Sequence, residues 1–267
     1  MNIKSRFAPS PSGPMHLGNI VSALYVWGIT KALNGTIQLR IDDHDQQRSK
    51  NQWSAMIIED LHWLGMYFDE YSIQSQNNQK YQHAFEILAE KNLVYTCHCT
   101  RNDINKHQSS SHTELYYPGT CRNTDHGLSN QHGIRVKIPE SIIDWNDLKT
   151  GTHQDCPLIQ CGDFLIKDRK QNWTYQFCSV VDDVNDNINL IIRGEDIQSS
   201  TARQILLQQL LYPEADRKHY FHHTLLMDSQ NQEKLGKRTQ SEHFRSMAES
   251  KCVCTWWRWV CSLQRTV

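Results

Sequence analysis

The sequence predicts an α/β fold built around a parallel sheet. Apolar residues recur at helical spacing from Leu17, and a strand pattern follows at 36–41, where Ile37, Leu39 and Ile41 alternate with polar residues. This strand–helix–strand order is typical of parallel sheets. A further buried-strand pattern at 190–192 leads into Arg193. Because parallel sheets bind ligands at the carboxyl ends of their strands, we expect the functional site there.

The remaining elements follow in order along the chain. Two further helical patterns are carried by apolar residues at Trp53, Ile57, Leu61 and Leu64, and at Tyr81, Phe85 and Leu88. After them come a short extended run at 93–95, an alternating strand at 134–138 and a helix at 201–211. These patterns predict helices that cover a sheet, as the α/β class requires.

Residues 100–130 differ in composition from the rest of the chain, because Ser, His, Asn and Gly replace most aliphatic residues. Cys97 and Cys99 lie in an extended segment and project to the same face, and Cys121 returns after the polar loop. Three thiolates need one more ligand to hold zinc, and spacing nominates His107 or His112. The alternative is that these are buried, unpaired cysteines.

Composition limits the classes of function. The formal net charge of −1 provides no overall attraction to nucleic acid, so any RNA contact requires local basic surface. No apolar run reaches the length of a membrane span, and the polar start has no signal-peptide core. We therefore expect a cytoplasmic protein without membrane contact. Nine scattered cysteines in such a chain indicate reduced thiols or metal ligands.

Two segments have the chemistry of a nucleotide site. In residues 6–19, prolines stiffen a loop, Gly13 and Gly18 allow close backbone approach, and His16 stands where the loop becomes a helix. The positive end of that helix suits an anion. Residues 234–238 place Lys234 and Lys237 on a glycine-containing segment, where flexible ammonium groups can hold pyrophosphate.

The order of the two segments resembles class I aminoacyl-tRNA synthetases, with 16–19 similar to the "HIGH" motif and 234–238 similar to "KMSKS". The run Arg-Phe-Ala-Pro-Ser-Pro-Ser-Gly at 6–13 narrows the resemblance to the glutamyl branch, and further similarity lies at 39–48, 60–65, 116–122 and 192–196. The resemblance covers residues 3 to 240. Fewer than thirty residues follow Arg238, so the chain most resembles the short paralogues that attach glutamate to the queuosine base of tRNA(Asp).

The resemblance implies roles for individual residues. The implied glutamate pocket comprises Arg6, Ser10, Asp42, Tyr175 and Arg193, with the acid at 42 meeting the α-ammonium group. The implied ATP site comprises His16, Gly18, Asn19, Lys234 and Lys237, with His16 and Lys237 catalytic and Mg²⁺ accompanying ATP. One structural zinc ion per chain is implied at Cys97, Cys99, Tyr117 and Cys121, with His112 as the alternative to the tyrosine. Two positions depart from the family: Asp42 replaces its glutamate and Gly236 its serine.

The resemblance also implies an organisation and a function. A Rossmann-like core comprises residues 1–95 and 189–240, a zinc-bearing acceptor-type subdomain is inserted at 96–188, and the atypical tail 241–267 is interpreted as a frameshifted end. The expected activity is tRNA-independent formation of glutamyl-adenylate from ATP and L-glutamate, followed by transfer to queuosine at the wobble position of tRNA(Asp), by a monomer. Three alternatives are a truncated synthetase charging tRNA(Glu), a non-catalytic zinc-dependent RNA-binding derivative and, more remotely, another HxGH-type nucleotidyltransferase.

Overall fold

The computed structural model describes residues 2–45, 47–108, 114–124, 127–129 and 131–226. Several positions singled out in the sequence lie outside these residues: His112, Lys234, Gly236, Lys237 and the tail 241–267.

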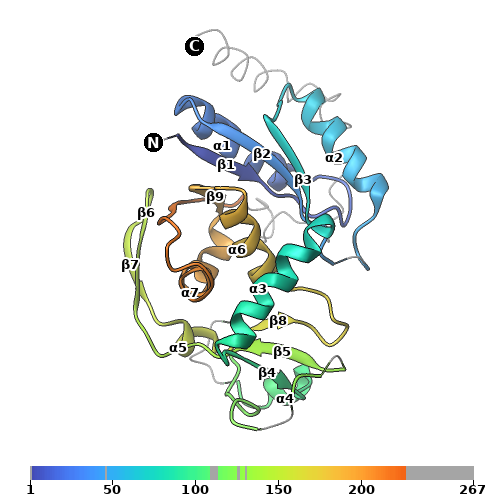
Figure 1. The fold of residues 1–267 in the computed structure, drawn as a ribbon. Coiled ribbons are helices and arrows are strands. Elements are labelled where there is room, and N and C mark those ends of the chain that lie inside the picture. The colour runs from blue at the N-terminus through green and yellow to red at the C-terminus, as the bar shows by residue number, and fades with distance from the viewer. Residues whose placement is uncertain (1, 46, 109–113, 125–126, 130, 227–267) are drawn as a thin grey trace.

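The described chain alternates strands and helices (Figure 1). The strands are β1 (Lys4–Phe7), β2 (Thr36–Ile41), β3 (Glu70–Ile73), β4 (Val94–Cys97), β5 (Gly133–Val136), β6 (Ile143–Asp147), β7 (Gly151–Asp155), β8 (Leu165–Lys167), β9 (Leu190–Gly194) and β10 (His219–His223). The α-helices are α1 (Leu17–Ala32), α2 (Asn51–Trp63), α3 (Asn78–Glu90), α4 (Arg101–Asn105), α5 (Pro157–Cys161), α6 (Tyr175–Asn185) and α7 (Thr201–Leu211). Short 3-10 helices are η1 (Gln74–Asn77) and η2 (Glu195–Ser200).

The predicted parallel sheet is confirmed. Seven strands lie in the order β3-β2-β1-β9-β10-β6-β7, and all neighbours are parallel except β6 and β7, which form an antiparallel hairpin. Residues of β9 alternate between the two faces: Leu190 and Ile192 join the core that includes α1 and α2, whereas Ile191 joins the core that includes α6 and α7. Burial on both faces explains why this strand is apolar without interruption.

A second, antiparallel sheet has the order β4-β5-β8 and lies at the end of the molecule away from β1 and β2 (Figure 1). Helix α3 runs between the two regions. The segment 96–188 contributes to both sheets, because β6 and β7 join the large sheet while β5 and β8 join the small one. The segment 96–188 as a whole is therefore not separate from the large sheet. We keep the inserted zinc-bearing subdomain as a proposal only for the part of this segment around the small sheet.

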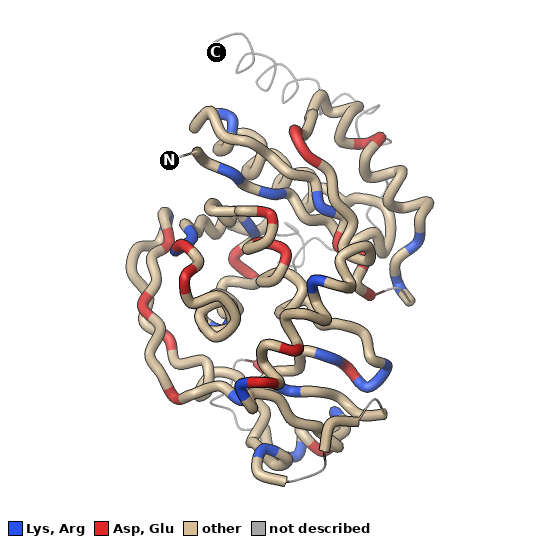
Figure 2. Tube along the Cα trace, viewed as in Figure 1, with Lys and Arg blue, Asp and Glu red and all other residues tan. Residues whose placement is uncertain are grey.

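The predicted strand at 36–41 and helix at 201–211 correspond to β2 and α7 residue for residue, and the other predicted elements overlap observed ones with ends that differ by a few residues. Strands β3, β6, β7, β8 and β10 were not predicted. In β10 the sequence His-Tyr-Phe-His-His does not alternate cleanly. No described helix is long and apolar enough to cross a bilayer. Acidic and basic residues are interspersed along the described trace (Figure 2), which agrees with the near-zero net charge.

Candidate active site

A cavity of about 250 Å³ opens at the carboxyl ends of β1, β2, β9 and β10. It is the place at which an open parallel sheet is expected to bind its ligand. The structure brings to this cavity all described residues of the predicted glutamate and ATP sites: Arg6, Ser10, His16, Gly18, Asn19, Asp42, Tyr175 and Arg193. Their individual roles stay predictions.

The loop after β1 delivers the start of α1 to the cavity. His16 is the residue before the first turn and has an extended backbone, and the side-chain oxygen of Asn19 accepts its backbone N–H at 3.1 Å. The first turn contains no acidic residue. The partial positive charge of the helix end therefore faces the cavity without an internal anion, which suits phosphate oxygens.

Tyr175 begins α6 and lies half-buried in the cavity wall, its ring centroid 6.4 Å from that of His44. Ser10 lies exposed in the loop after β1. These two side chains therefore reach the cavity from a loop and from the start of a helix, whereas Arg6, Arg40 and Arg193 lie in strands β1, β2 and β9.

A buried network of charges lies beside the cavity and includes Arg6 and Asp42, two residues of the predicted glutamate site. Arg40 is fully buried and donates from Nε to Asp42 Oδ1 at 2.8 Å and from its terminal nitrogen to Asp183 Oδ1 at 2.6 Å. Asp183 also accepts from Arg6 Nε at 3.0 Å. Burial alone would raise the pKa of Asp183, but Arg6 and Arg40 hold it well below its usual range. The charges of both arginines are thus compensated by carboxylates within the protein.

Arg193 is held differently, by neutral groups. Its Nε–H donates to His222 Nε2 at 3.0 Å, and its two terminal nitrogens donate to Gln204 Oε1 at 2.6 Å and to Thr201 Oγ1 at 2.8 Å. Asp147 contacts the other side of the His222 ring, where its Oδ2 accepts a hydrogen bond from Nδ1 at 2.7 Å. Sequence reasoning missed these partners, because they come from β6, β10 and α7 and have no spacing in common.

The contacts leave Arg193 able to bind an anion. A guanidinium group has five N–H donors, and three of them are occupied. Among the described residues no carboxylate lies within ion-pair distance of Arg193, although the side chain lines the cavity and is only 6% exposed. A buried cation with neutral partners and two remaining donors is suited to a ligand carboxylate.

His222 is neutral at pH 7. Burial and, to a lesser extent, the charge of Arg193 lower its pKa to about 4, although the hydrogen bond to Asp147 acts in the opposite direction. Because Asp147 accepts from Nδ1, the proton lies on Nδ1 and the lone pair on Nε2 faces Arg193.

The depressed pKa of His222 predicts acid sensitivity. In the unfolded chain a histidine takes up its proton near pH 6.5, whereas the folded site, which also faces Arg193, Asp147 and His153, resists protonation down to about pH 4. The stabilising contribution is therefore complete above pH 6.5 and is lost as pH falls toward 4. We expect wild type to lose ~2–3 kcal/mol more unfolding free energy than His222→Gln between pH 7 and pH 4.5. Urea unfolding at both pH values measures this, and equal losses would contradict it.

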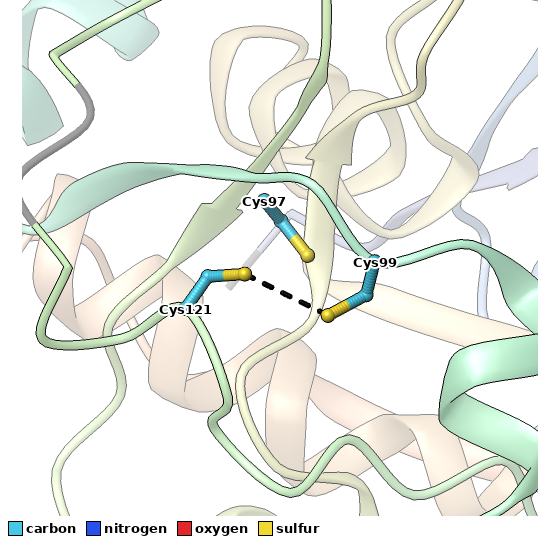
Figure 3. A group of neighbouring side chains, drawn as sticks. All are labelled: Cys97, Cys99 and Cys121. Atoms are coloured by element: carbon cyan, nitrogen blue, oxygen red, sulfur yellow. Dashed lines mark hydrogen bonds between the residues drawn. The ribbon is translucent and has the colours of Figure 1, made fainter.

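The predicted metal cluster forms in the small sheet region (Figure 3). The Sγ atoms of Cys97, Cys99 and Cys121 all lie within 4.8 Å of one another, and those of Cys99 and Cys121 are 3.6 Å apart. Sulfur ligands of a tetrahedral zinc ion lie ~3.8 Å apart. No histidine or carboxylate of the described residues joins the three sulfurs. This excludes His107 as a ligand in this arrangement.

Tyr117 lies beside the sulfurs. Its Oη is 3.5 Å from Cys97 Sγ and accepts the backbone N–H of Cys121 at 2.8 Å. Arg135 places its guanidinium 3.6 Å over the Tyr117 ring and its Nε 3.2 Å from Cys97 Sγ, so a cation offsets the negative charge of thiolates. Three soft sulfur donors with an adjacent phenol fit zinc.

The fold and site define a class I tRNA synthetase, and comparison with known proteins agrees. Residues 2–251 match the family model described as "tRNA synthetases class I (E and Q), catalytic domain". The chain belongs to this family and is an aminoacyl-tRNA synthetase-like ligase.

Within the family, the chain is similar to two proteins named Glutamyl-Q tRNA(Asp) synthetase. The protein from Burkholderia cenocepacia (strain HI2424) is 37% identical over 243 residues, covering 88% of this chain and 80% of the relative. The protein from Albidiferax ferrireducens (strain ATCC BAA-621 / DSM 15236 / T118) is 35% identical over 265 residues, covering 89% and 85%.

A solved structure has the same fold. The glutamate tRNA ligase from Elizabethkingia meningosepticum CCUG26117, solved in complex with its amino acid, superposes with a TM-score of 0.75 at 26% identity. The match covers 89% of this chain and 52% of that ligase, so the chain spans about half the length of that protein.

Proposed function

We propose that the protein activates L-glutamate with ATP in the absence of tRNA and transfers the glutamate to the queuosine base at the wobble position of tRNA(Asp). One observation carries the glutamate assignment: Arg193 is a buried, cavity-lining cation whose partners among the described residues are all neutral. The names of the relatives support the tRNA(Asp) acceptor. Because ATP and tRNA are its proposed substrates, we place the protein in the cytoplasm. We further propose that it acts as a monomer.

The glutamate site would divide the charges of the substrate among its residues. Arg193 binds a carboxylate through its two remaining donors, and Asp42 accepts from the α-ammonium group. Asp183 already compensates Arg6, so Arg6 contributes hydrogen-bond donors more than net charge. Ser10 and Tyr175 complete the pocket with hydroxyl groups.

The start of α1 would hold ATP. His16, Gly18 and Asn19 present the helix end to the phosphates, and Lys234 and Lys237 contribute ammonium groups from outside the described residues. In activation, a glutamate α-carboxylate oxygen bonds to the α-phosphorus and the bond to the pyrophosphate oxygen breaks. His16 and Lys237 stabilise the negative charge that moves to the leaving group. Mg²⁺ bound with ATP supplies further charge neutralisation.

We also propose one structural zinc ion per chain, held by Cys97, Cys99, Tyr117 and Cys121. The sulfur spacing and the nearby phenol support this set. The ion would hold the small sheet in shape.

Glutamate-dependent ATP–pyrophosphate exchange without tRNA tests the proposed activation, with aspartate and glutamine as controls. Transfer is then tested with tRNA(Asp) that carries queuosine, with tRNA(Asp) that lacks it and with tRNA(Glu). Exchange without tRNA, and labelling of the queuosine tRNA alone, is the expected result. Exchange that requires tRNA(Glu) would favour a truncated glutamyl-tRNA synthetase, and absence of exchange in folded protein would favour the non-catalytic alternative.

Substitutions at position 42 test the amino-group contact. Asp42 replaces the longer glutamate of the family, so its carboxylate lies one methylene further from the ligand, although Arg40 orients it. We expect Asp42→Glu to preserve or lower the KM for glutamate. Asp42→Ala is expected to raise this KM by ~5- to 150-fold, which corresponds to the loss of a charged contact of about 1–3 kcal/mol. Exchange kinetics measure both, and an unchanged KM in the alanine variant would remove Asp42 from the site.

A further inference from the structure

We infer that His222, oriented by Asp147, is a positioning residue that fixes the guanidinium group of Arg193 for the carboxylate of the substrate. The inference rests on the proposed function, since it concerns the same pocket. It explains the place of His222 and Asp147, which are each about 1% exposed. Neither side chain lines the cavity, but His222 contacts Arg193, which does.

Asp147 determines which nitrogen of His222 carries the proton. Its Oδ1 accepts the backbone N–H groups of Lys149 at 2.8 Å and Thr150 at 2.9 Å. Its Oδ2 accepts the backbone N–H of His222 at 3.0 Å and the ring Nδ1 at 2.7 Å. Three of these four groups are backbone amides that can only donate, so the carboxylate serves as an acceptor throughout. The ring must therefore present Nδ1–H to Asp147 and a lone pair at Nε2.

That lone pair fixes Arg193. The guanidinium Nε–H donates to Nε2 at 3.0 Å, while Thr201 Oγ1 lies 3.3 Å from the same Nε2 and accepts from a terminal nitrogen of Arg193. Gln204 holds the other terminal nitrogen. Contacts at all three nitrogens define the plane of the group and leave one donor on each terminal nitrogen for a ligand.

The neutral ring also preserves the charge that the substrate needs. A carboxylate in direct contact with Arg193 would compensate it, as Asp183 compensates Arg6 and Arg40. With imidazole between Asp147 and Arg193, the acid orients the ring without contacting the guanidinium. Discrimination between glutamate and the uncharged side chain of glutamine benefits from that arrangement.

Asp147→Asn is the sharpest test, because it is nearly isosteric. An asparagine amide that keeps its oxygen on Lys149 and Thr150 points its NH₂ group at the ring of His222 and at its backbone N–H, which loses its acceptor. The ring then has to accept a hydrogen bond at Nδ1 and carry its proton on Nε2. Two donors, His222 Nε2–H and Arg193 Nε–H, would then face each other, and the hydrogen bond between these residues would be lost. An aspartate-to-asparagine change beside a histidine is known to invert the tautomer in this way. We expect the KM for glutamate to rise ~10- to 100-fold in exchange assays, with the KM for ATP unchanged.

Two substitutions of His222 separate positioning from packing. Glutamine can present an acceptor oxygen to Arg193, whereas leucine fills similar volume without one. We expect His222→Gln to retain a lower glutamate KM than His222→Leu. Asp144→Asn is the matched control, since Asp144 lies exposed on the same strand as Asp147. It should leave both KM values unchanged.

Nitrogen-15 NMR of the histidine rings tests the tautomer independently of activity, and an Nε2–H tautomer in folded wild type would overturn the inference. So would a wild-type glutamate KM in folded Asp147→Asn and His222→Leu. If wild type itself shows neither glutamate-dependent exchange nor glutamate binding by calorimetry, the proposed function fails, whatever the variants do.

Discussion

Replacing Arg193 by glutamine is expected to lower kcat/KM for glutamate by ~30- to several-thousand-fold, which corresponds to the roughly 2–5 kcal/mol of a buried charge pair that loses one partner. The substrate carboxylate would lie in a buried site without a cation. Exchange kinetics over a range of glutamate concentrations measure the loss, and direct calorimetry separates binding from chemistry.

The same substitution should not destabilise the free protein. Arg193 is a buried charge whose described partners are all neutral, so removing the charge relieves a desolvation cost while glutamine keeps some of the hydrogen bonds. We expect the unfolding free energy of Arg193→Gln to equal or exceed that of wild type. Loss of activity together with retained stability is typical of a residue selected for binding.

Arg203→Gln is the matched control. Arg203 is as buried as Arg193, at 6% exposure, but it pairs with Glu114 and does not line the cavity. It should lower stability and leave the glutamate KM unchanged. If Arg193→Gln kept a wild-type KM, the carboxylate would have to bind elsewhere, and Arg6 would become the first candidate.

Removing Cys99, a ligand of the proposed zinc ion, is expected to abolish metal binding and to unfold the small sheet region. The core there is small, comprising Tyr95, Cys97, Ile104, Tyr117 and Cys121 with Cys99 packed against it. Burial and the adjacent sulfurs raise the pKa of Cys99 to about 11 in the metal-free arrangement, so without metal this sulfur stays a neutral thiol at pH 7. A zinc ion would replace the thiol proton and join the three sulfurs. Metal binding therefore supplies folding free energy to this region.

Metal analysis of purified protein should find one zinc ion per chain in wild type and almost none in Cys99→Ser. We expect the melting temperature of the variant to fall by ~5–10 °C, as does that of wild type treated with chelator. Cys156→Ser is the control, because Cys156 is a free, half-buried cysteine outside the metal group. The zinc proposal would be wrong if purified wild type were folded without zinc and had the same melting temperature as Cys99→Ser.

Local motifs made the cavity-lining residues predictable. Arg6, Ser10, His16 and Asp42 lie in or next to short runs of distinctive sequence, and a strand followed by Arg193 and Gly194 signalled a ligand at its carboxyl end. The parallel sheet followed from apolar periodicity, because burial on one or both faces of a strand leaves a pattern that can be read without a structure.

The charge partners behind those residues were decided by tertiary structure. Asp183 compensates Arg6 across 177 positions of sequence, and His222 reaches Arg193 from the neighbouring strand β10. A hydrogen bond between distant segments leaves no periodic pattern in either segment, so it cannot be predicted from the spacing of residues in the sequence. The sequence alone therefore indicated which cations could bind glutamate. The tertiary structure established that Asp183 compensates the charge of Arg6, whereas the charge of Arg193 has no carboxylate partner among the described residues. The reason is that only the fold determines which buried groups lie within hydrogen-bonding distance.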